Sequence, residues 1–164
     1  MTPTIDPLIA TLRDELTHYG EMLALLDRQQ ETVVNRMADE MFAATAAIQS
    51  QSKVIQEVRS RREAAQRVVA RELCVAETST FVELTPLLPP DYRPLITSLV
   101  EENNDLLRQI QNRARQNHLV LSRSVELMRQ FINTLAPAAS VRTYTDRGSR
   151  TDIPAGAPLY EAVG

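Results

Sequence analysis

The chain has 164 residues, enough for one domain, and only 4% of them are aromatic, with no tryptophan. So few large side chains argue against a thick globular core and favour thin seams of leucine, valine and alanine between helices. The 18 basic and 21 acidic residues are interspersed and give a net charge of −3, which argues against a nucleic-acid-binding surface.

Apolar residues recur at steps of three and four along residues 5–73, the period at which one face of an α-helix repeats. Pro7 suits the first position of a helix, and the next proline is Pro86. The pattern therefore predicts one very long helix over about residues 7–77, or a pair of helices broken once. Its apolar stripe is too long to remain in water, so the helix must pack against a partner.

The apolar steps slip at Val33, Met37, Met41 and Ala44, which is a stutter in the helical repeat. Small and polar residues follow over residues 42–53. The first helix is predicted to be either continuous or bent, and a bend is expected within residues 42–53.

Four prolines in and just after residues 78–92 forbid a continuous helix and predict that the chain reverses there. A second helix is predicted over about residues 92–135. Glycine, proline, serine and threonine dominate residues 137–164, which predicts a flexible C-terminal tail. The predicted fold is all-α: an extended antiparallel helical hairpin, or coiled-coil bundle of long helices, over residues 1–136, followed by the tail.

Three consequences follow from pairing two antiparallel helices of unequal length. The start of the first helix would extend beyond its partner and expose a leucine stripe, which is usually a contact surface. The arginines at positions 59, 61, 62, 67 and 71 would lie near Glu101, Glu102 and Asp105. Asn103 and Asn117 lie inside the second apolar stripe, where they would fix the register of the seam or, alternatively, contact a partner.

Residues for catalysis or metal binding are sparse. His18 and His118 are a hundred residues apart, and neither has a second histidine or a cysteine at ligand spacing; Cys74 beside an apolar stripe is best explained as a small buried side chain. We therefore predict that the protein is not an enzyme and needs no metal or cofactor. The chain shows neither a secretory signal nor an apolar run of the length a membrane span needs, which predicts a cytoplasmic protein without membrane insertion.

The segment LIATLRDELTHYGEMLALLDRQQETVV, followed by VIQEVRSRREAAQRVVAREL, resembles the start of FlgN-type flagellar export chaperones. The later segment RARQNHLVLSRSVELMRQFINTL resembles the last helix of that family. TYTDRGSR resembles the tyrosine-to-glycine motif that follows it. The resemblance spans roughly residues 8–150.

The resemblance implies a cytoplasmic chaperone that holds the disordered C-terminal segments of hook–filament junction proteins. It would prevent their premature assembly and deliver them to the export gate of the flagellar type III apparatus. We expect an added helix of the client to contact the second stripe, although the same residues could instead pack on the first helix. The expected contact residues are Leu121, Val125, Met128, Ile132 and Leu135, and the expected residues for docking at the export gate are Tyr144 and Gly148.

Two other functions stay open at this point. One is a self-associating coiled-coil scaffold, and the other is a type III secretion chaperone for a different client. A homodimer is a further possible partner, whichever function holds. The stutter and the unequal helix lengths argue mildly against a scaffold, because both interrupt an indefinite regular seam.

Overall fold

The computed structural model describes the backbone of residues 5–135 and the side chains of residues 5–130. The described chain contains α1 (Ile5–Val34), α2 (Ala38–Glu72), the short helix α3 (Phe81–Leu84), the 3-10 turn η1 (Thr85–Leu87) and α4 (Arg93–Leu135). The predicted all-α fold of long helices is confirmed. The chain divides into two units, residues 1–127 and 128–164, and the packing described below is that of the first unit.

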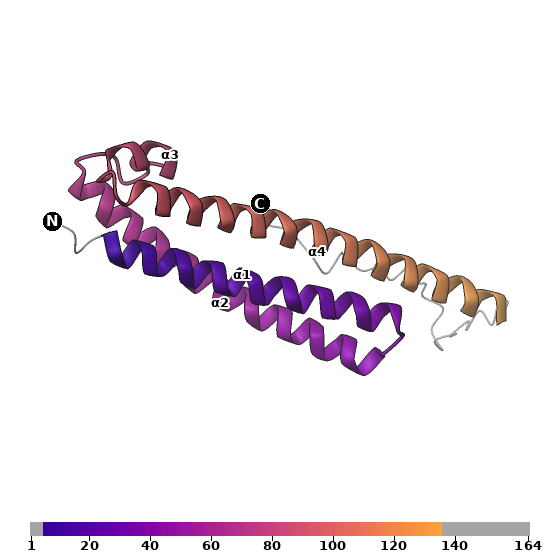
Figure 1. The fold of residues 1–164 in the computed structure, drawn as a ribbon. Helices are drawn as coiled ribbons and strands as arrows, with labels where there is room; N and C mark the ends of the chain where they lie inside the picture. The colour runs from indigo at the N-terminus through magenta and orange to yellow at the C-terminus, as the bar shows by residue number, and fades with distance from the viewer. Residues whose placement is uncertain (1–4, 136–164) are drawn as a thin grey trace, which may run out of the picture. The chain divides into compact units, whose positions relative to one another are not determined.

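Two possibilities were predicted for residues 7–77, one continuous helix or a pair broken once, and the structure has the pair. The chain breaks between α1 and α2 at residues 35–37 and folds into a helical hairpin, so α1 and α2 run in opposite directions (Figure 1). The break lies at the stutter rather than within residues 42–53, and α2 ends at Glu72.

The break is a Schellman motif built without glycine. Arg36 has a left-handed backbone with φ of 56°, the Met37 N–H donates to the Thr32 carbonyl at 2.9 Å, and the Arg36 N–H donates to the Val33 carbonyl at 3.3 Å. Cys74 closes α2 in the same way, also with φ of 56°. Because glycine usually holds this position, the sequence carries no conventional stop signal at either end.

The α1–α2 hairpin also changes the partners of the arginines on α2. Arg61 lies 3.2 Å from Asp14, and Arg62 lies 3.1 Å from Glu15, both on α1. The predicted partners on α4 are therefore wrong: Glu101, Glu102 and Asp105. The reason is that acidic residues of α1, Asp14 and Glu15, pair with Arg61 and Arg62 instead.

The main apolar core lies at the end of the hairpin that holds the start of α1. Its buried residues come from α1, α2, the loop before α4 and α4 itself: Ile5, Leu8, Ile9, Leu12, Val69, Leu88, Ile96 and Leu99. The predicted overhang of the first helix is therefore wrong, since its leucines are covered. Leu84 and Leu88 of the proline-rich reversal are buried as well and form a plug at this end, whereas Val82 is exposed.

Candidate functional site

α4 lies along α1 in the same direction (Figure 1), and two asparagines of α4 bond to α1. The Asn103 side-chain amide donates to the Leu12 carbonyl at 3.0 Å, and the Asn117 amide donates to the Leu26 carbonyl at 2.7 Å. Both bonds join residues that are 91 positions apart. Both asparagines therefore lie in the seam, as predicted, and link the helices at one offset; α4 is parallel, not antiparallel, to the α1 helix that they contact.

A polar layer crosses the three long helices near the far end of this seam. Asn117 of α4 also donates to Gln29 Oε1 of α1 at 3.1 Å, and Gln29 Nε2 donates to Thr45 Oγ1 of α2 at 3.1 Å. Beside this layer, Arg113 Nε lies 2.6 Å from Asp27 Oδ1, and Arg113 Nη1 donates to Gln30 Oε1 at 2.7 Å. The seam here is held by polar contacts.

The constant offset between the helices shows where the seam ends. Adding 91 to Val34, the last residue of α1, gives Val125, so α4 passes the hairpin turn at about that residue. Val125 is 68% exposed and Leu127 is 65% exposed. Apolar side chains on this part of α4 therefore face solvent because the hairpin beneath them has ended.

The predicted contact residues are only partly brought together. Around the α4 axis, Leu121 lies about 40° and Val125 about 80° from Asn117, so both continue the seam face. Leu121 is half-buried against the hairpin, whereas Val125 and Met128 are exposed. The side chains of Ile132 and Leu135, together with Tyr144, Gly148 and the tail over residues 137–164, lie outside the described residues.

Exposed apolar residues also occur on the hairpin turn, level with Val125. Val34 is 69% exposed, and Met37 and Phe42 are exposed as well. These residues were not among the predicted site residues, because a continuous first helix has no turn there. The stutter at Val33 and Met37 was the signal in the sequence that could have found them.

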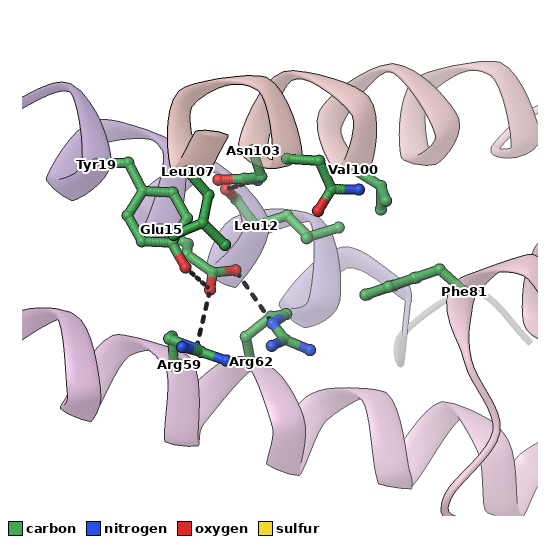
Figure 2. A pocket seen from close by; sticks show the side chains of 10 residues that line it. Leu12, Glu15, Tyr19, Arg59, Arg62, Phe81, Val100, Asn103 and Leu107 are labelled. Carbon is green, nitrogen blue, oxygen red and sulfur yellow. Dashed lines mark hydrogen bonds and ion pairs between the residues drawn. The ribbon is translucent and has the colours of Figure 1, made fainter. Parts of the chain in front are cut away.

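A cavity of about 150 Å³ lies between α1, α2, α4 and Phe81 (Figure 2). The buried Glu15 carboxylate is one of the groups that line it. This carboxylate accepts a hydrogen bond from the Tyr19 hydroxyl at 2.8 Å, pairs with Arg62 at 3.1 Å and lies 4.0 Å from Arg59. Arg62 in turn stacks over the Phe81 ring, with its guanidinium carbon 5.8 Å from the ring centroid.

The chemistry of this cavity is structural. Burial raises the pKa of Tyr19 above its ordinary value, and the neighbouring Glu15 carboxylate raises it further. The phenol therefore stays protonated and donates to Glu15, whose oxygens are already engaged by Tyr19 and Arg62. Each oxygen of this carboxylate therefore accepts one hydrogen bond, and Glu15 links α1 to Arg62 of α2.

No helix in the described part of the chain is long and apolar enough to cross a membrane. A family model described as the FlgN protein matches residues 1–152, most of the chain. Comparisons with curated proteins and with solved structures found no match. The chain therefore belongs to the FlgN family, whose members are flagellar export chaperones.

Proposed function

We propose that this chaperone binds the amphipathic C-terminal segments of hook–filament junction proteins in the cytoplasm. It keeps these segments from assembling prematurely and delivers them to the flagellar type III export apparatus. The observation that carries the proposal is the exposed continuation of the seam on α4, where Val125 and Leu127 face solvent at the end of the hairpin. Membership of the FlgN family supports a role as a flagellar export chaperone in general.

An exposed apolar helix face is suited to such a client. A segment that forms a coiled coil only after export carries an apolar stripe at helical spacing, and it can dock as an added helix. Each Å² of apolar surface that docking removes from water contributes about 25 cal/mol. Ordering the client segment costs free energy in return, so the affinity is moderate and release remains feasible.

The test is a calorimetric titration of the full chain with C-terminal segments of hook–filament junction proteins from the same organism. We expect saturable, roughly one-to-one binding with a negative heat-capacity change, the mark of apolar burial. Val125→Asp places a charge on the docking face and should weaken binding at least about ten-fold. Leu119→Asp is the matched control, because Leu119 is 59% exposed but lies about 160° around α4 from Asn117.

The two variants separate the possible readings. Retained helicity with lost binding in Val125→Asp, and normal binding in Leu119→Asp, would support the α4 docking face. Equal loss in both variants would reject it, since binding would not depend on the face. Unfolding of Val125→Asp would mean that this residue belongs to the core, and would overturn the assignment.

We propose a separate role for the tail, in which Tyr144 and Gly148 dock at the export gate. Deletion of residues 140–164 should then leave client binding unchanged while blocking export. Tyr144→Ala should reproduce the export defect, whereas Tyr160→Ala, in the same tail, should not. Loss of client binding on deletion would contradict the assignment of these residues to the gate.

The competing functions make different predictions in the same assays. A self-associating scaffold would form a permanent oligomer that sediments as one species at all concentrations and buries Val125, and Val125→Asp would dissociate it. A type III chaperone for another client would stay monomeric or dimeric and give no heat with junction-protein segments. We expect neither result.

A further inference from the structure

The seam between α4 and the hairpin is built differently along its length. In residues 93–103, which we call the proximal half, Ile96, Leu99 and Asn103 are buried, and the two apolar residues join the main core. In residues 104–127, the distal half, which the structure describes completely, Asn117 is the only buried residue. The distal half is therefore attached chiefly through a polar side chain and half-buried apolar residues.

Such a seam opens at low cost. A buried polar residue in a helical seam fixes alignment but lowers stability relative to leucine. Segments with few buried apolar contacts open locally with free energies well below that of global unfolding. The distal half can therefore leave the hairpin while the proximal half stays anchored in the core, with the hinge just after Asn103.

The surface of α1 beneath the distal half, which we call the seat, has a defined chemistry. Asp27 and Gln30 pair with Arg113, while the Leu26 carbonyl and Gln29 accept hydrogen bonds from Asn117. Half-buried Leu16 and Leu23 share this face at heptad spacing. The seat thus fits a helix that offers an apolar stripe, an amide donor and an arginine, as α4 itself does.

We infer that the seat is a second interaction surface, which takes an amphipathic helix of the client in place of the distal half of α4. The inference rests on the proposed function and extends it. The client helix enters at the open end of the seam near Val125 and then displaces α4 from α1. Its apolar stripe replaces that of α4, and a basic residue on it pairs with Asp27.

The probe for the seat is a fluorescein-labelled synthetic peptide with the sequence of residues 104–127, added to the full-length chain. This peptide carries all the groups that α4 places on the seat, so it competes with the chain's own helix. We expect saturable binding by fluorescence anisotropy. A peptide of the same composition in scrambled order should not bind.

Two asparagine variants of the full chain form a matched pair. Asn117→Leu makes the distal seam apolar and holds α4 closed, so the peptide should bind about five-fold more weakly. Asn103→Leu makes the same change in the anchored proximal half and should leave peptide affinity unchanged. Equal affinities for Asn117→Leu and the parent chain would overturn the inference, because the peptide would then bind elsewhere.

A third variant should act in the opposite direction. Arg113→Ala removes the α4 side of the contact with Asp27 while the peptide keeps its own arginine, so the peptide should bind about three-fold more tightly. No detectable binding to Arg113→Ala would also overturn the inference. Circular dichroism of each variant confirms that the helices are retained.

The final measurement separates this inference from the proposed function. A junction-protein C-terminal segment should displace the labelled peptide from the full-length chain. If the segment binds by calorimetry but leaves the peptide in place, the seat is not the client site and the proposed function stands. If the peptide binds as expected but no junction-protein segment does, the proposed function fails while the seat remains a site for amphipathic helices.

Discussion

Removal of the Glu15 carboxylate should destabilise the fold far more than removal of an exposed carboxylate in a similar ion pair. The Glu15 and Arg62 side chains are only 6% and 15% exposed, and they lie 3.1 Å apart. Glu15→Ala leaves the Arg62 guanidinium without its buried partner and the Tyr19 hydroxyl without its acceptor. Breaking a buried pair typically costs 3–5 kcal/mol, and because Gln66 still contacts Arg62, we expect about 3 kcal/mol.

The matched control is Glu77→Ala. Glu77 lies 2.9 Å from Arg71, but these side chains are 50% and 63% exposed, so the loss should stay below about 1 kcal/mol. Urea unfolding followed by circular dichroism at 222 nm gives the free energy of unfolding for both variants. Similar losses in the two variants would refute the reasoning, because the distance between the charges would then matter more than their burial.

Three further predictions concern the turn, the plug and the buried phenol. Arg36→Gly relieves a left-handed backbone and should raise the free energy of unfolding by about 0.5–1 kcal/mol; a loss would show that the Arg36 side chain contributes more than its strain costs. Leu88→Ala should cost about 3 kcal/mol and exposed Val82→Ala less than about 0.5 kcal/mol, both by urea unfolding. The stability advantage of the parent chain over Tyr19→Phe should be constant up to about pH 10, the ordinary pKa of tyrosine, and should shrink above it, by about 1.4 kcal/mol at pH 11. Only the unfolded phenol ionises in that range, so an advantage that stayed constant to pH 11 would contradict the raised pKa.

The periodic stripes predicted the helices well, because an apolar repeat reports directly which face a helix must bury. They did not predict where the first helix breaks. The break depends on backbone hydrogen bonds to the carbonyls of α1 and on a left-handed Arg36, and an arginine gives no sign of either. A glycine at position 36 would have marked the turn.

The error in the position of the break also led to errors in which helices were predicted to pack together. A continuous first helix leaves only the second helix to cover it, whereas the real hairpin pairs α1 with α2 and adds α4 as a third helix. The exposed residues Val34 and Phe42 are part of the same error, since they exist as a surface only because the chain turns there. Val125 is exposed because α1 ends level with it. The apolar stripe on α4 carries no information about where α1 ends.

The direction and offset of α4 depend on polar contacts that the apolar stripes cannot specify. Asn103 and Asn117 bond to the carbonyls of Leu12 and Leu26, but every residue of α1 has a carbonyl. These two bonds alone would therefore tolerate a slip of α4 by one heptad. The alignment of α4 along α1 must therefore be fixed by side chains of α1 that are not repeated one heptad away.

The polar layer supplies such side chains. A slip of one heptad toward the start of α1 would replace Gln29 by Met22 and leave the Asn117 amide facing a thioether, a weak acceptor. The same slip would replace Asp27 by Gly20, so the arginine on α4 that pairs with it would lose its carboxylate. The distal seam thus gives up apolar burial in exchange for a single alignment, and a seam of this composition is expected to open more readily than the apolar proximal half.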